Sequence, residues 1–278
     1  MRELLAAFCS RLAKTYWACA MERHQQEIIE TVARILRNCR SILFVTGAGV
    51  SADSGVPTYR GIGGLYDVEA TEEGLAIEEI LSGPMLRSNP ELTWKYLRQI
   101  GDAASGATFN RAHEVIAEME RHFPRVWTLT QNVDGFHRLA GSENVIEIHG
   151  NMRSLSCMGC SFRTPVSEGV DNEIAPRCPK CNAVMRPDVV LFGEPLPDEA
   201  LAVMRREMER GFSAVVCVGT SAVFPYIQDP VFEAKHWGAP TFEINPRETV
   251  LTHFVDYRLD MGAAEAMDAI WSRIRETE

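Results

Sequence analysis

The sequence predicts an α/β fold, a Rossmann-like doubly wound parallel sheet with a smaller inserted lobe. Short apolar runs alternate with helical patterns along the 278 residues, and this alternation is typical of a parallel sheet covered by helices on both faces. Two polar segments, 62–111 and 151–190, interrupt it. We expect them to build the smaller lobe. The first should be helical and the second, which contains two pairs of cysteines, a zinc-binding ribbon.

The alternation begins with an amphipathic helix in residues 22–40, where apolar side chains recur at helical spacing. Apolar runs then predict buried strands, the last of them an edge strand: Ser41–Val45, Val126–Thr130, Val145–Ile148, Ala214–Val218, Thr241–Ile244 and Tyr257–Asp260. Helical patterns occur both in this alternation and in segment 62–111: Ala112–His122, Asp198–Arg210, Ala76–Leu81 and Pro90–Ile100.

This pattern divides the chain into an N-terminal extension, residues 1–21, and one domain, residues 22–278. Within the domain, the Rossmann-like lobe takes residues 22–61, 112–150 and 191–278. The first twenty residues lack the continuous apolar region of a secretory signal. An amphipathic extension, a start-codon artefact and a transit peptide remain open for them.

Composition and charge exclude several classes of function. With 46% hydrophobic and 24% charged residues the chain is an ordinary globular protein. Its formal charge of -10 argues against a nucleic-acid partner, because a surface that follows phosphates needs clustered lysine and arginine. No run of eighteen apolar residues occurs, so we expect no membrane span. The cysteines show no disulfide framework, and a cytoplasmic location is therefore expected.

Four of the eight cysteines form a C-x2-C-x17-C-x2-C pattern: Cys157, Cys160, Cys178 and Cys181. Each C-x2-C turn presents two thiolates, and the intervening residues let the two turns meet around one tetrahedral Zn(II). Four thiolates leave no coordination position for water or substrate, so we expect the ion to be structural.

The stretch GAGVSA after the first predicted strand fits the glycine-rich turn G-x-G-x-x-[GA] that approaches a dinucleotide. A helix is expected to begin just beyond it, with an N-cap at Ser51, Asp53 or Ser54. In dehydrogenases an acidic residue follows about twenty positions later, at the end of a second strand. Here Asp67 and Glu69 fall in a polar segment with no strand before them. The turn therefore predicts a dinucleotide held in an unusual way, although any tight turn also needs glycine.

Further polar clusters follow three other predicted strands: TQNVDGFHRLAG, His149-Gly150 and Gly219-Thr220-Ser221. Each of them alone would be explained by a helix cap or a structural histidine. Parallel strands, however, place their ligands at their carboxyl ends. The clusters together therefore predict one site.

Taken in chain order, GAGVSADSGVPTYRG, TQNVDGFHRLAG, the strand-ending His-Gly, the paired cysteines, VVLFGEPLP, VGTSAVFPY and INP resemble the sirtuin family over residues 40–264. The resemblance implies an NAD-dependent protein lysine deacylase. NAD is consumed in that reaction: the acyl-lysine amide oxygen attacks the ribose carbon as nicotinamide leaves, and the acyl group passes to ADP-ribose. The implied partners are acyl-lysine proteins or peptides.

The resemblance implies that His149 is the general base that activates a ribose hydroxyl after nicotinamide has left. A neutral imidazole, with an ordinary pKa of about 6.5, suits that role. The implied NAD-binding positions are Gly47, Ala48, Gly49, Ser51, Asp53, Tyr59 (usually Phe in the family), Arg60, Gln131, Asn132, Val133, Asp134, Gly219, Thr220, Ser221, Asn245 and Ala264.

The segment Val189–Glu194 is implied as an edge strand that pairs with the substrate peptide. Val190 and Phe192 would line the acyl-lysine tunnel. The implied substrate-binding positions are Val189, Val190, Phe192, Gly193 and Glu194.

Members of the family that prefer succinyl or malonyl groups carry a Tyr-x-x-Arg pair on the helix after an NP motif. In NPELTWKYLRQI, Tyr96 and Arg98 are instead two residues apart, and Leu97 and Ile100 occupy the corresponding positions. Residues two apart on a helix do not share a face. We therefore expect acetyl or other uncharged acyl groups to be preferred, with desuccinylase selectivity as the alternative.

Two other functions remain as alternatives: an NAD glycohydrolase or ADP-ribosyltransferase that uses the same pocket, and a non-catalytic NAD-sensing or scaffold module. The VVLFGEPLP segment favours a deacylase over the first, since a glycohydrolase needs no peptide-binding strand. The presence of His149, Asn132 and Asp134 argues against the second.

Overall fold

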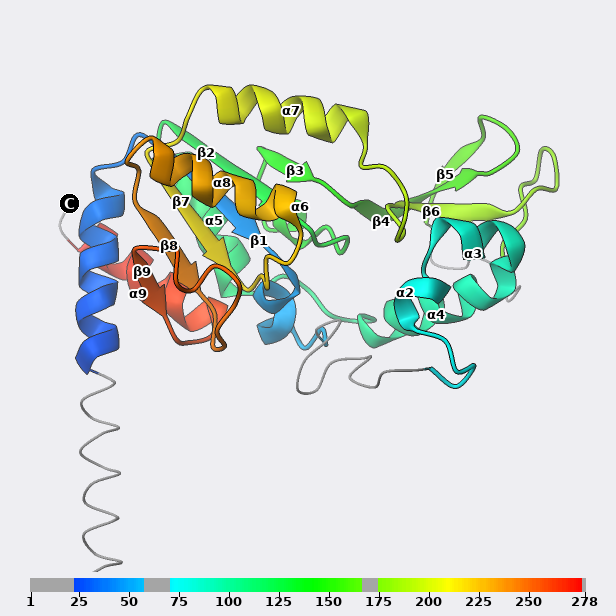
Figure 1. Ribbon diagram of the computed structural model, residues 1–278, viewed down its shortest axis with the longest axis horizontal. Helices are drawn as coiled ribbons and strands as arrows, with labels where there is room; N and C mark the ends of the chain where they lie inside the picture. The colour runs from blue at the N-terminus through cyan, green and yellow to red at the C-terminus, as the bar shows by residue number, and fades with distance from the viewer. Residues whose placement is uncertain (1–22, 58–70, 167–174, 277–278) are drawn as a thin grey trace, which may run out of the picture.

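Six parallel strands form the larger sheet of the computed structural model, which describes residues 23–57, 71–166 and 175–276. The strands lie in the order β3-β2-β1-β7-β8-β9 (Figure 1). Their bounds are β1 Ser41–Thr46, β2 Arg125–Thr130, β3 Val145–Glu147, β7 Ala214–Val218, β8 Thr241–Ile244 and β9 Tyr257–Leu259. Strands β2 and β3 extend the sheet on one side of β1, and β7 to β9 extend it on the other. β1 is thus the switch point at which such sheets bind ligands.

Helices cover both faces of this sheet (Figure 1). Ile42 and Phe44 of β1 point into one core, shared with the helix 23–37 and with α5 (Arg111–His122) and α9 (Ala263–Arg275). Leu43 and Val45 point into the other core, beneath α7 (Asp198–Glu209) and α8 (Pro225–His236). Burial on both faces is the reason why these strands are continuous apolar runs in the sequence.

The smaller lobe joins the two inserted segments. Its antiparallel sheet, in the order β5-β4-β6, consists of β4 Gly150–Cys157, β5 Arg163–Pro165 and β6 Met185–Val189. Against it pack α2 (Ile77–Ile80), α3 (Gly83–Ser88) and α4 (Pro90–Ala103), through a third hydrophobic core. The buried indole of Trp94 donates a hydrogen bond of 2.9 Å to the carbonyl of Met185, which joins α4 to β6.

The predicted fold class is confirmed, and the predicted strands of the larger sheet lie within one residue of their observed bounds. The predicted helix 22–40 ends at residue 37. Asp67 and Glu69 lie outside the described residues. The division into an extension, a domain and two lobes at the stated boundaries stays a prediction. None of the described helices is long and apolar enough to cross a membrane.

Two local predictions were wrong. The helix after β1 is a short 3₁₀ helix, Ala48–Ser54, that begins directly after Gly47, so the residues expected as N-caps lie inside it. Of the predicted edge strand Val189–Glu194, only Val189 belongs to a strand, at the end of β6, and Phe192 forms one isolated bridge with Ser82. Beyond it Gly193 adopts a φ of 77°, and the chain turns so that the Glu194 carboxylate accepts a hydrogen bond from the Leu191 amide.

The ends of β1 and β7 meet backbone to backbone. The amide of Gly49 donates to the carbonyl of Gly219 over 2.8 Å. Gly219 has a φ of 59°, and a Cβ added there would lie 2.3 Å from the Val50 nitrogen. Only glycine therefore fits at this position.

We predict that Gly219→Ala destabilises the protein by about 3 kcal/mol or more, because the methyl group collides with backbone that cannot move aside. Gly238→Ala is the matched control. Gly238 also has a positive φ, of 72°, but open space around it, so that substitution should cost only about 1 kcal/mol of backbone strain. Urea unfolding of both variants measures the difference, and equal losses would contradict the steric explanation.

Candidate active site

The predicted NAD-binding residues in the described part of the chain follow the carboxyl ends of β1, β2, β7, β8 and β9, on one edge of the larger sheet (Figure 1). His149 follows β3 at the same edge. The parallel topology accounts for this convergence of residues that are far apart in the sequence. Tyr59 and Arg60 lie outside the described residues.

Ser51, Asn132 and Asp134 form one hydrogen-bonded group. The buried Ser51 hydroxyl donates to the Asp134 carboxylate over 2.8 Å and accepts from the Asn132 amide over 3.1 Å. The other carboxylate oxygen of Asp134 accepts from the amide of Phe136, at the start of α6 (Phe136–Leu139). These bonds fix the orientation of three polar side chains that the sequence placed at two different strand ends.

A second group crosses from β2 to β8. The Gln131 side-chain amide donates to the buried Thr220 hydroxyl over 2.7 Å, and the Asn245 amide donates to the Thr220 carbonyl over 3.2 Å. Thr220 thus connects the predicted residues of three strands. Ser221 beside it is exposed.

His149 is half-buried, and both of its ring nitrogens have partners. Nδ1 lies 3.0 Å from the Gln131 carbonyl, and Nε2 lies 2.7 Å from the Tyr226 hydroxyl. Burial lowers the pKa of His149 below its ordinary value, although the hydrogen bond to Gln131 opposes that shift. The ring is therefore neutral at pH 7 and able to accept a proton, and it loses that ability only as the pH falls through the lowered pKa.

Asp53 and Ala264, both predicted to bind NAD, are hydrogen-bonded to each other. The Asp53 carboxylate accepts a 2.9 Å hydrogen bond from the Ala264 amide, in the first turn of α9. An anion at that end of a helix satisfies an unpaired amide and complements the helix dipole. The structure thus gives Asp53 a capping role besides the one the resemblance implied.

The predicted substrate-binding residues connect His149 to the small lobe. The Val190 amide donates to the His149 carbonyl over 2.8 Å, and the Phe192 amide donates to Leu81 over 2.9 Å. Arg186 holds Glu194 through two contacts of 2.6 and 2.7 Å. Burial raises the pKa of Glu194, but the bonds from Arg186 and Leu191 outweigh it and bring that pKa below its ordinary value. Glu194 is therefore engaged within the fold.

The residues that correspond to the acyl-selective pair are apolar and packed. Leu97 is buried, and Ile100 packs against the same core as Val133 and Phe192. The Tyr96 hydroxyl is bonded to Glu73. No tyrosine–arginine pair occurs at these positions of the described helix α4.

Sequence reasoning missed Tyr226, which is the second residue of α8. The predicted positions after β7 end at Ser221, five residues earlier. The proline before Tyr226 was a usable signal, because proline favours the first position of a helix and so fixes where the next side chain stands.

The predicted zinc ligands gather at one point. The sulfur atoms of Cys157, Cys160, Cys178 and Cys181 all lie within 4.8 Å of one another. Cys157 and Cys181 are 3.4 Å apart, and Cys160 and Cys178 are 3.7 Å apart, well beyond a disulfide bond of about 2.05 Å. Zinc–sulfur bonds of about 2.3 Å in a tetrahedron place sulfurs roughly 3.8 Å apart. The four thiols therefore fit one zinc ion, which would join the two turns of the ribbon.

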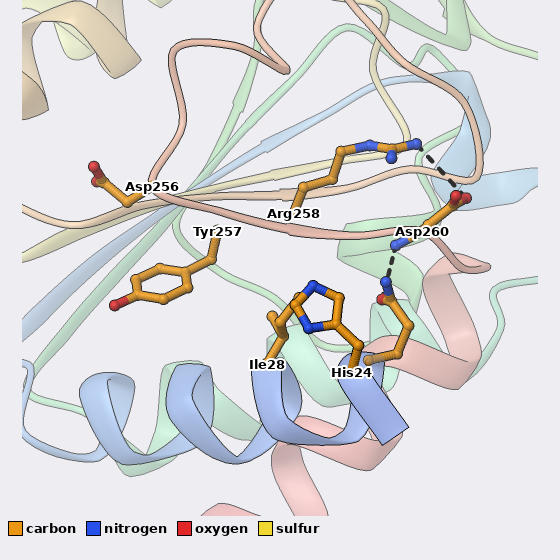
Figure 2. Close-up of a pocket in the computed structure, with 7 residues that line it drawn as sticks. His24, Ile28, Asp256, Tyr257, Arg258 and Asp260 are labelled. Atoms are coloured by element: carbon orange, nitrogen blue, oxygen red, sulfur yellow. Dashed lines mark hydrogen bonds and ion pairs between the residues drawn. The ribbon is translucent and has the colours of Figure 1, made fainter. Parts of the chain in front are cut away.

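A separate hollow lies between the helix 23–37 and β9 (Figure 2). It contains none of the predicted site residues. Its lining includes residues of the edge strand β9 and Asp260 after it. The Asp260 amide donates to the Gln25 side chain over 3.0 Å, and Arg258 lies 3.6 Å from the Asp260 carboxylate. The bond between Gln25 and Asp260 attaches the helix to the end of the last strand.

We predict that zinc stabilises the fold and takes no part in chemistry. Cys157→Ser should lose the bound zinc and lower Tm by roughly 10 °C, because the two turns of the ribbon would lose their common anchor. Cys39→Ala, which removes a buried thiol of the larger lobe, should keep one zinc per chain. Metal analysis and thermal unfolding provide the readouts, and a zinc-free Cys157→Ser protein with unchanged Tm would contradict the prediction.

Comparisons with known proteins agree with this geometry. The Sir2 family profile matches residues 47–225. A Pseudomonas aeruginosa protein named NAD-dependent protein deacylase 2 is 50% identical over 249 residues, which cover 88% of this chain and 97% of the relative. An Aquifex aeolicus NAD-dependent protein deacylase is 38% identical, with 85% and 96% covered.

Solved structures resemble the chain as well. A Sir2 homologue in complex with NAD has a TM-score of 0.78 at 36% identity, with 90% of this chain and 94% of that chain covered. A Sir2 protein with a deacetylated p53 peptide and 3′-O-acetyl ADP-ribose has a TM-score of 0.78 at 27% identity, with 86% and 96% covered. With the family profile matching well over half of its length, the chain belongs to the Sir2 family, the sirtuins.

Proposed function

We propose that this chain is an NAD-dependent protein lysine deacylase, which moves an acyl group from lysine to ADP-ribose and releases nicotinamide. The observation that carries the proposal is the state of His149. Its Nδ1 faces a carbonyl, which can only accept, so Nδ1 carries the proton and Nε2 keeps the lone pair that a base needs. The deacylase names of its relatives and the NAD complex of a similar structure support the same function.

The chain's own residues supply binding and proton transfer. The turn formed by Gly47, Ala48 and Gly49, together with Gly219, is suited to the pyrophosphate, because glycines have no side chain to keep a ligand away from the backbone. The amides of Gly47, Gly49 and Gly219 themselves donate to backbone carbonyls within the fold. The amides of Gln131 and Asn132, the hydroxyl of Ser51 and the carboxylate of Asp134 are suited to the ribose and the carboxamide. NAD, when bound, supplies the ribose carbon that the acyl-lysine oxygen attacks.

Val190 and Phe192 are the proposed walls of the acyl-lysine tunnel. Because the Val190 amide is bonded to the carbonyl of His149, an acyl-lysine beside Val190 would lie close to the base. Partners are acylated lysines of proteins or peptides, as in the p53 peptide complex of the similar structure. The same proximity disfavours the alternative of a glycohydrolase or ADP-ribosyltransferase, which needs no acyl-lysine beside its base.

A cytoplasmic location is part of the proposal. It is supported by the free thiols of the described cysteines: Cys39, Cys157, Cys160, Cys178, Cys181 and Cys217. Free thiols, four of them in a zinc-binding arrangement, suit a reducing compartment.

We predict that His149→Ala lowers deacylation of an acetyl-lysine peptide at least 100-fold, because the ribose hydroxyl loses its base. His253→Ala, which removes an exposed histidine, should leave the rate unchanged. Mass spectrometry of the wild-type reaction should detect O-acetyl-ADP-ribose together with free lysine peptide. Formation of ADP-ribose alone would favour the glycohydrolase, and full activity of His149→Ala would contradict the assigned base.

We also predict that acetyl-lysine or other uncharged acyl-lysine peptides have at least about a tenfold higher kcat/KM than the matched succinyl peptide, since a carboxylate beside apolar side chains would be desolvated without a partner. The double variant Leu97→Tyr with Ile100→Arg restores the spacing of the acid-selective pair and should raise succinyl activity relative to acetyl activity. A wild-type enzyme that favours succinyl-lysine would overturn the expectation.

A further inference from the structure

The base nitrogen of His149 is already occupied in the ligand-free protein. Tyr226 places its hydroxyl 2.7 Å from Nε2. Of the described side chains that face the site, Tyr226 alone contacts the nitrogen that the proposed reaction uses. It was not among the predicted site residues, and no role follows for it from the deacylase function.

The direction of this hydrogen bond is settled by the other side of the ring. The carbonyl of Gln131 can only accept, so Nδ1 of the neutral ring carries the hydrogen and Nε2 has the lone pair. The Tyr226 hydroxyl must therefore donate to Nε2. Burial raises the pKa of Tyr226, so its hydroxyl keeps its proton throughout the neutral range.

Aromatic packing holds the phenol in place. The rings of Phe224 and Tyr226 stack with centroids 5.5 Å apart and an angle of 13° between their planes. Both rings stand nearly perpendicular to the imidazole, at 86° and 83°. Pro225 between them is the first residue of α8 and fixes the backbone there. His149 is thus held at two nitrogens and against two ring edges.

We propose that Tyr226 is a positioning residue for His149: its hydroxyl keeps Nε2 oriented as a proton acceptor until a hydroxyl of the co-substrate takes its place. The exchange replaces one hydroxyl donor by another, so the imidazole need not rotate or change its tautomer when the ligand arrives. A base held in its working orientation before binding saves the cost of ordering it during the reaction. The inference rests on the proposed role of His149 as the base.

The two steps of the reaction should depend differently on Tyr226. In the order that the sirtuin resemblance implies, nicotinamide leaves before the base acts. A residue that works through His149 should therefore affect the transfer of the acyl group and leave nicotinamide exchange unchanged. A residue that only shapes the NAD pocket would affect both steps.

The first measurement uses the ligand-free protein. Tyr226→Phe removes the hydroxyl and keeps the stacked ring, and thermal unfolding establishes that the variant is folded. In ¹⁵N-histidine-labelled protein, His149→Asn assigns the signals of His149 among the seven histidines. We expect the Nε2 resonance of His149 in Tyr226→Phe to move toward that of an unbonded acceptor nitrogen, while Nδ1 stays protonated.

The second measurement compares two rates in the same variant. Acetyl-peptide deacylation should fall about tenfold, in the range found for residues that orient a functional histidine, while exchange of labelled nicotinamide into NAD should stay within about twofold. Tyr257→Phe is the matched control, since it removes a phenol hydroxyl at the distant β9 hollow (Figure 2). It should change neither rate.

Three results would overturn the inference: an unchanged Nε2 resonance, unchanged or faster deacylation, or an equal fall in both rates. The activity of His149→Asn tests the proposed role of His149 as the base, on which the inference rests. If His149→Asn itself deacylates normally, then His149 is not the base, and the role of Tyr226 falls with it. If His149→Asn is inactive and Tyr226→Phe is fully active, only the positioning role is wrong.

Discussion

The contact between the backbones of Gly49 and Gly219 is the constraint on which the site depends. It closes the carboxyl ends of β1 and β7 to hydrogen-bonding distance, at the point where the strand order turns. Because neither residue has a side chain, the two turns approach closely enough for Ser51 and Thr220 each to bond to a residue after β2. A larger residue at either position would separate the two halves of the site.

The bonds that follow from this contact orient polar groups before any ligand is present. Gln131 takes part in two of these contacts: its side chain bonds to Thr220, and its backbone carbonyl faces His149. One residue thereby links the end of β7 to His149, which follows β3. Electrostatic catalysis depends on such fixed dipoles, because groups that are already oriented need not reorganise during the reaction.

The strands, the fold class and the cysteine quartet could be predicted because each leaves a local mark in the sequence. Runs buried on both faces are apolar throughout, and ligand pairs have a characteristic spacing. The turn at Gly193 could not be predicted in this way. The segment VVLFG has the composition of a strand, and it departs from one because Glu194 is held by Arg186, eight residues earlier on the preceding strand. The contact of Tyr226 with His149 is likewise tertiary, between residues 77 apart in the chain.

His149 lies between β3 of the larger sheet and β4 of the smaller one. The hydrogen bond from the Val190 amide to the His149 carbonyl therefore joins the two lobes where the chain passes from one to the other. Gly150, next to His149, begins β4 and pairs with Val189 at the end of β6. The ribbon that holds the four cysteines is thus inserted between two chain segments that are themselves bonded, so backbone hydrogen bonds hold its entry and exit together beside His149. A ribbon of another length or composition can be accommodated beyond these bonds without moving the histidine. The architecture therefore allows the outer part of the insert to diversify during evolution while the proton-accepting end of the sheet stays the same.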